Sequence, residues 1–137
     1  MNDSARLPLN LRAGLWALCG FTALGLLLEA LHAFKLGLYL DVQSEARRLL
    51  WRLAHAHGAL LGLLNVGYAL VAQTWPRLDD RLVSRSLLSA LVLMPSGFFL
   101  GGLFARGGDP GASVALAAAG GVALLFGLIR LALKARC

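Results

Sequence analysis

Four long stretches without charged side chains constrain this chain more than any other feature. The first runs from Ala13 to Leu28 and continues with interruptions to Leu40, and the others cover residues 53–75, 87–105 and 112–129. A helix that spans a bilayer needs about 20 apolar residues, and lipid offers no hydrogen-bond partner to a non-helical backbone. The sequence therefore predicts an all-α protein: a single integral membrane domain over residues 1–137, folded as a four-transmembrane-helix bundle.

The boundaries of these stretches predict helices of unequal length. We expect membrane spans at about residues 13–38, 48–75, 87–105 and 112–133, with Ser44 as an N-cap before Glu45. Continuous helices over residues 13–40 and 45–74 would measure about 42 and 45 Å, whereas the hydrocarbon layer is about 30 Å thick. The first helical hairpin is therefore expected to be longer than the second and to project from the outer face.

Composition and charge agree with a membrane protein. Hydrophobic residues make up 58% of the chain, charged residues make up 15%, and the mean hydropathy is +0.72. Soluble domains are about 45–50% apolar and about 25% charged. The net charge of +6 comes from basic residues between the apolar stretches, as in membrane proteins. We therefore expect the lipid bilayer as the main partner and exclude a nucleic-acid partner.

The basic residues predict an orientation. Eight lie on the side of the two termini, namely Arg6, Arg12, Arg77, Arg81, Arg85, Arg130, Lys134 and Arg136. Four lie on the opposite side, namely Arg47, Arg48, Arg52 and Arg106. Since cytoplasmic loops carry the excess of Lys and Arg, both termini are expected in the cytoplasm. The bias toward Ala, Leu, Gly and Arg favours a bacterial inner membrane as the plasma membrane concerned.

Small residues recur at a spacing of four on three of the expected helices. They are Gly58 and Gly62, Gly97 and Gly101, and Ser113, Ala117 and Gly121. Small residues let membrane helices approach closely. These faces are expected to pack inside the bundle, or to join the protein to other membrane subunits or to a homo-oligomer.

The candidate chemistry lies in the first two spans. Glu29 and His32 are three residues apart, so they lie near one face of the first helix. A carboxylate in an apolar span is costly and is a functional candidate by default. If the first two helices form a hairpin, His32 and His55 lie at similar depth near the outer face, with Glu29 about one turn deeper.

His55 and His57 differ by about 200° around their helix, so they cannot both face the first helix. His55 shares the small face with Gly62, which is expected to be the packed one. We therefore expect His55 to point toward the first helix and His57 toward other helices or a neighbouring subunit.

Three functions suit these residues. In the first, Glu29, His32, His55 and His57 supply ligands to a transition metal, since imidazole and carboxylate bind Zn, Fe, Cu or Ni. In the second, His32 and His55 are the axial ligands of a haem. The segment His55-Ala56-His57-Gly58 resembles the His-x-His segment of haem-copper-oxidase-type helices over four residues, and this resemblance implies haem or metal binding.

The third function is acid–base catalysis by Glu29 and a histidine on a lipophilic substrate. The segment Ala54-His55-x-x-Gly58 is similar to one in small four-pass hydroxylaminobenzene mutases, although His57 replaces the carboxylate of those enzymes. Two further readings involve no chemistry. The protein could be an accessory or scaffold subunit of a larger membrane complex, or Glu29 could pair with Lys35 or His32 and hold the hairpin together.

Overall fold

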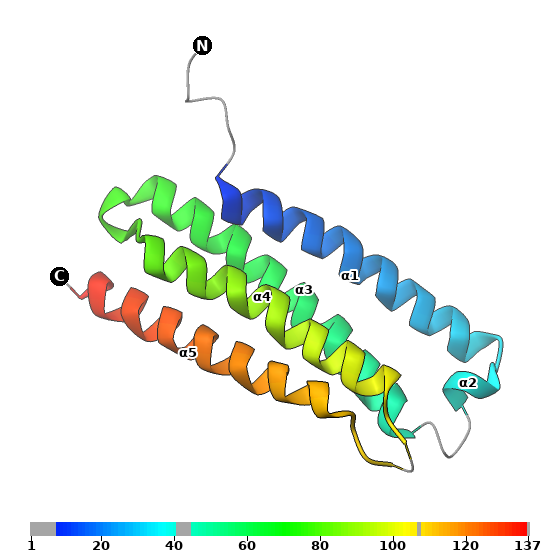
Figure 1. Ribbon diagram of the computed structural model, residues 1–137. Helices are drawn as coiled ribbons and strands as arrows, with labels where there is room; N and C mark the ends of the chain where they lie inside the picture. The colour runs from blue at the N-terminus through cyan, green and yellow to red at the C-terminus, as the bar shows by residue number, and fades with distance from the viewer. Residues whose placement is uncertain (1–7, 41–44, 107, 137) are drawn as a thin grey trace.

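The computed structural model describes residues 8–40, 45–106 and 108–136, and these residues form helices joined by short turns (Figure 1). The long helices are α1 (Leu9–Ala33), α3 (Glu45–Thr74), α4 (Arg81–Leu103) and α5 (Ala115–Ala135). The short ones are α2 (Gly37–Leu40), η3 (Pro76–Leu78) and η4 (Ala112–Val114). The predicted cap Ser44 lies outside the described residues.

Four helices are long and apolar enough to cross a bilayer, as predicted. They cover Leu9–Ala33, Glu45–Thr74, Arg81–Leu103 and, with η4 included, Ala112–Ala135. The all-α class is therefore confirmed for the described residues, and the four apolar helices support a multi-pass membrane protein. The four segments have 25, 30, 23 and 24 residues.

The first long helix ends earlier than the sequence suggested. We expected it to continue to about residue 38, but α1 stops at Ala33. Lys35 adopts a left-handed conformation with φ of 51°, and its N–H donates to the His32 carbonyl while the Leu36 N–H donates to the Leu31 carbonyl. This pair of bonds is the Schellman motif, which terminates helices. The chain then forms α2.

The third long helix begins earlier than expected, at Arg81 instead of about residue 87. Asp80 is its N-cap: Oδ1 accepts hydrogen bonds from the Leu82 N–H at 2.8 Å and the Val83 N–H at 3.3 Å. These are two of the backbone donors that a helix start leaves without partners.

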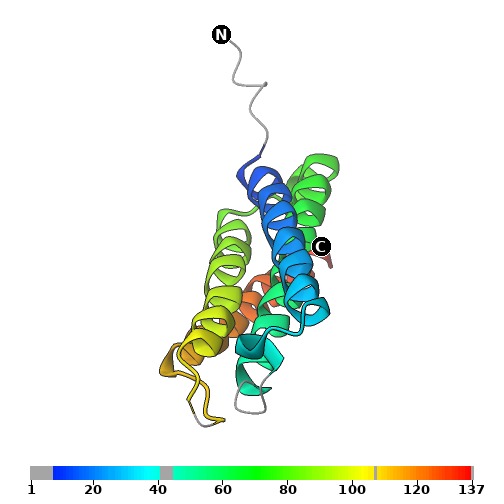
Figure 2. The same ribbon diagram turned by 90° about the vertical axis from the view of Figure 1, so that its right-hand side faces the viewer.

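The long helices neighbour one another in the order α1, α3, α4, α5. Each packs closely on the next, α1 approaches α4 at a few positions, and the described backbones of α1 and α5 make no close approach. The arrangement is an open row, with α1 and α5 as its outer members. In both views α2 and the C-terminal end of α4 lie at one end, which we call the loop end (Figures 1 and 2). The opposite end, with Leu9, η3 and the end of α5, is the terminal end.

Glycines set the spacing within this row. On the α1–α3 seam, a methyl group on Gly14 would lie 2.6 Å from the Gly62 carbonyl oxygen. On the α4–α5 seam, one on Gly120 would lie 2.7 Å from the Met94 backbone nitrogen. The predicted packing of small residues is thus confirmed for Gly62. On α5 it is Gly120, and not Gly121, that meets the α4 backbone.

The largest apolar cluster lies between α3, α4 and α5. Its buried members are Leu61, Ala90, Leu91, Met94 and Ala117, and partly buried side chains of α1 pack against it. This cluster holds the middle of the row together, and smaller apolar clusters pack toward the two ends, around Leu28 and Trp51 at the loop end and around Tyr68 and Val83 at the terminal end.

Candidate functional site

An open groove runs between α1 and α3 near the loop end and is closed at one side by α2. We call it the His55 groove. It has a volume of about 880 Å³. Its lining residues are Thr22, Gly25, Leu26, Leu28, Glu29, His32, Tyr39, Arg48, Leu49, Arg52, Leu53, His55 and Ala56. Small-molecule sites in proteins commonly occupy 300–1,000 Å³ and combine apolar walls with a few polar groups, as this groove does.

The structure brings three of the four predicted site residues to this groove. Glu29, His32 and His55 line it, and His57 does not. The His57 ring lies against Phe98 of α4, with ring centroids 5.0 Å apart, and its Nδ1 is 2.9 Å from the Leu53 carbonyl oxygen. The expectation that His57 faces another helix is therefore confirmed.

His55 points toward α1, as expected, and its hydrogen bond fixes the tautomer of its neutral ring. Its Nδ1 lies 2.6 Å from the backbone carbonyl oxygen of Phe21. A carbonyl oxygen can only accept, so Nδ1 carries the proton and Nε2 of the neutral ring keeps its lone pair. Among the described residues, Nε2 has no hydrogen-bond partner. It is available to a molecule in the groove.

Gly25 makes room for this ring. A methyl group on Gly25 would lie 2.5 Å from Cε1 of His55 and 2.8 Å from its Nδ1. Both distances are shorter than van der Waals contact, so a larger residue would push the ring away from α1. A glycine on an apolar helix can signal such a close approach, but the sequence does not show which side chain approaches Gly25.

His32 and Glu29 stand on the open side of the groove. His32 meets Tyr39 of α2 edge to face, with ring centroids 6.4 Å apart, and Tyr39 is only 3% exposed. Glu29 is exposed, and it forms no ion pair with Lys35, His32 or any other described residue. The prediction that such a pair holds the hairpin together is therefore not supported.

A polydentate metal centre is also not supported. In the part of the chain that the structure describes, no three His, Cys, Asp or Glu side chains are arranged to hold a metal ion. One cause is visible: the His57 ring lies against Phe98 of α4 and does not line the groove.

Arginines give the loop end of the groove a positive charge. Nη1 of Arg48 donates to the carbonyl oxygens of Tyr39 at 3.3 Å and Leu40 at 3.5 Å, which ties α2 to α3. Arg52 is exposed in the groove wall. With Glu29 as the one acidic lining residue, the described wall carries an excess of positive charge that favours anions.

The terminal end contains polar residues that sequence reasoning missed. The buried carboxylate of Asp80 accepts from Arg130, with Nη2 at 2.9 Å from Oδ2, and from Lys134, with Nζ at 3.0 Å from the same oxygen. These partners, and the backbone donors of Leu82 and Val83, hold the pKa of Asp80 well below its ordinary value. An Asp just before an apolar stretch is an N-cap signal, which could have revealed Asp80.

Buried amides link three helices nearby. Nδ2 of Asn10 on α1 donates to Oδ1 of Asn65 on α3 at 2.7 Å, and the Ser84 hydroxyl of α4 donates to Oδ1 of Asn10. Nδ2 of Asn65 donates to the Leu61 and Leu87 carbonyl oxygens. Such bonds are a common cohesive element between membrane helices.

Comparisons with protein-family models, with curated proteins and with solved structures find no significant match to this chain.

Proposed function

We propose that the His55 groove binds a lipophilic weak acid, such as a long-chain carboxylic acid, and that His55 accepts its proton. The observation that carries this proposal is the 2.6 Å hydrogen bond between Nδ1 of His55 and the Phe21 carbonyl. This bond leaves Nε2 as a base on the wall of a groove of about 880 Å³. A general base must lie within hydrogen-bond reach of the proton that it takes.

The chemistry of the walls supports this ligand class. Leu26 and Leu49 line the groove and are 69% and 56% exposed, so the groove offers apolar surface to a hydrocarbon chain. In the transfer step the O–H bond of the acid breaks and an N–H bond forms at Nε2, which yields an anion and an imidazolium. The guanidinium of Arg52, which also lines the groove, stabilises that anion.

A fluorescent fatty acid and its methyl ester, added to the purified full chain in neutral detergent, test the proposal. We expect saturable binding of the acid and weaker binding of the ester, which has no proton to give. His55→Gln should weaken binding of the acid about tenfold, since a hydrogen bond to a charged group contributes about 1.5–3 kcal/mol. His57→Gln is the matched control and should bind normally, because His57 faces Phe98. Equal binding of acid and ester, or equal losses in the two variants, would contradict the proposal.

Haem binding is the second candidate, supported by the same bond. Histidines that bind a metal through one ring nitrogen commonly donate the other N–H to a backbone carbonyl, as His55 does. Addition of haem to the purified protein tests this reading. A Soret band that is lost in His55→Ala and kept in His57→Ala would favour haem over the weak acid.

The accessory-subunit reading is the outcome if neither ligand binds. The open row supports it, because α1 and α5 lie at its outer sides, where a second copy or other membrane subunits could pack.

We further propose a bacterial inner membrane as the location, with the terminal end in the cytoplasm. The excess of basic residues at that end supports this orientation. Reporter fusions at either terminus would show activity on the opposite side if the orientation were wrong.

A further inference from the structure

We infer that a second groove, on the outward face of α5 at the terminal end, binds the headgroup of an anionic phospholipid. We call it the α5 groove, and it is lined by Arg77, Phe126, Ile129, Arg130, Leu133 and Lys134. Its volume is about 640 Å³. The inference is independent of the His55 groove, which lies near the other end of the helices.

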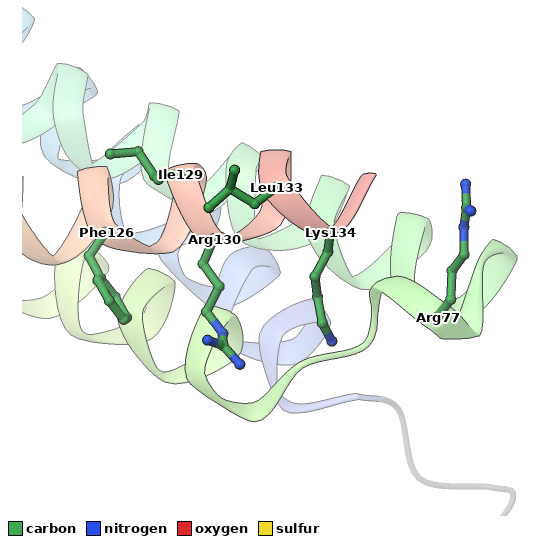
Figure 3. A pocket seen from close by; sticks show the side chains of 6 residues that line it. All are labelled: Arg77, Phe126, Ile129, Arg130, Leu133 and Lys134. Carbon is green, nitrogen blue, oxygen red and sulfur yellow. The ribbon is translucent and has the colours of Figure 1, made fainter. Parts of the chain in front are cut away.

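The lining residues of α5 lie in two neighbouring rows along the helix. Phe126, Arg130 and Lys134 form one row on α5, Ile129 and Leu133 form the neighbouring row, and Arg77 stands on η3 beyond the end of the helix (Figure 3). The cationic residues Arg130, Lys134 and Arg77 therefore lie in the last turns of α5 and on η3, where headgroups lie, with Arg77 pointing to the other side from Arg130 and Lys134 (Figure 3). Phe126 and Ile129 lie toward the middle of the bilayer, where acyl chains lie, and Leu133 lies between Arg130 and Lys134 along the helix.

The cations are held in place before any lipid arrives. Arg130 and Lys134 both contact Oδ2 of Asp80, which is 8% exposed and does not line the groove. Their side chains remain 41% and 36% exposed, so they can contact a second anion. Lys134 also donates to the backbone carbonyl of Asp79, whose carboxylate does not line the groove.

Charge complementarity favours an anionic lipid over a neutral one. The groove wall carries the charges of Arg77, Arg130 and Lys134, and the nearby carboxylates of Asp79 and Asp80 leave a net positive charge. Basic pockets at the ends of transmembrane helices are typical sites for anionic headgroups. The apolar row distinguishes a lipid from a free phosphate, which would gain nothing from Ile129 and Leu133.

Native mass spectrometry of the full chain in micelles tests this inference, with phosphatidylglycerol and phosphatidylcholine added in equal amounts. We expect selective retention of phosphatidylglycerol. Arg77→Gln should lower that selectivity about fivefold. Arg85→Gln is the matched control, because Arg85 is exposed and does not line the groove. Equal retention of both lipids by the wild type, or an equal loss in Arg85→Gln, would overturn the inference.

The apolar wall gives a second test that does not depend on the folding of a charge variant. The double variant Ile129→Ala, Leu133→Ala should retain less phosphatidylglycerol while keeping its helical circular dichroism. Inorganic phosphate at equal concentration should not displace the lipid from the wild type. Displacement by phosphate, or unchanged retention in the double variant, would show that the groove binds a soluble anion instead.

Discussion

Asp80 at the terminal end and His55 at the loop end are both polar, yet their surroundings differ. Both carboxylate oxygens of Asp80 accept hydrogen bonds, from backbone donors on one side and from Arg130 and Lys134 on the other. At the loop end, one nitrogen of His55 is satisfied, and the other has no partner among the described residues and stands beside an open groove. Satisfied groups hold helices together, whereas groups left open are available to a ligand.

The largest expected effect is the loss of the Asp80 carboxylate. Asp80→Ala removes the N-cap of α4 and leaves Arg130 and Lys134 without their shared partner. We expect the free energy of unfolding to fall by about 2 kcal/mol. Denaturant unfolding in micelles measures it. Glu29→Ala at the loop end is the contrasting variant and should stay within about 0.5 kcal/mol of the wild type. Similar losses in both variants would erase the difference between the two ends.

A methyl group at Gly25 should disturb the loop end. Gly25→Ala places that group against the His55 ring and strains the bond from Nδ1 to the Phe21 carbonyl. We expect a loss of about 1 kcal/mol in unfolding free energy. Gly20→Ala is the matched control, because no atom lies within 4 Å of a methyl group there. It should be neutral or stabilising, since Ala favours helix over Gly. Equal changes in the unfolding free energy of the two variants would show that the His55 ring does not pack against Gly25.

The ionised carboxylate of Asp80 should stabilise the fold at neutral pH, and this stabilisation should be lost in acid. Because the pKa of Asp80 is lower in the folded than in the unfolded protein, the carboxylate stabilises the fold above the unfolded value of about 3.9. This stabilisation is lost as the pH falls through that value toward the folded pKa. Asp80→Asn keeps an N-cap but removes the charge, so we expect it to be about 1 kcal/mol less stable than the wild type near neutral pH. The difference should shrink below about pH 4, and a constant difference from pH 7 to pH 2 would contradict the ion pairs.

A small effect is expected for His57. Its ring packs on Phe98 and its Nδ1 bonds to Leu53 of its own helix. His57→Gln should change the unfolding free energy by less than about 1 kcal/mol. It should leave the fluorescence of a fatty acid bound in the His55 groove unchanged, which a titration can check. A clear change in that fluorescence would mean that the groove extends to the α4 side of α3.

Hydrophobicity was enough to predict the helices, because a backbone in lipid has few alternatives to a helix. The directions of His55 and His57 also followed from sequence, since their 200° separation forces them onto different neighbours. The end of α1 did not follow, because Lys35 takes a left-handed conformation that glycine usually supplies. The partners of Asp80 did not follow either, since Arg130 and Lys134 are 50 and 54 residues away and meet it only in the folded row.

The most direct test of a ligand site at His55 is to measure which of its two ring nitrogens carries a proton. Nitrogen-15 magnetic resonance of histidine-labelled protein in bilayers reports it, with His55→Gln to assign the signal. We expect a protonated Nδ1 and an unprotonated Nε2 in the neutral ring. The Nε2 signal should change when a fatty acid is added, and it should not change when the methyl ester is added. A ring protonated at Nε2 alone, or a signal that neither molecule changes, would contradict this ligand site.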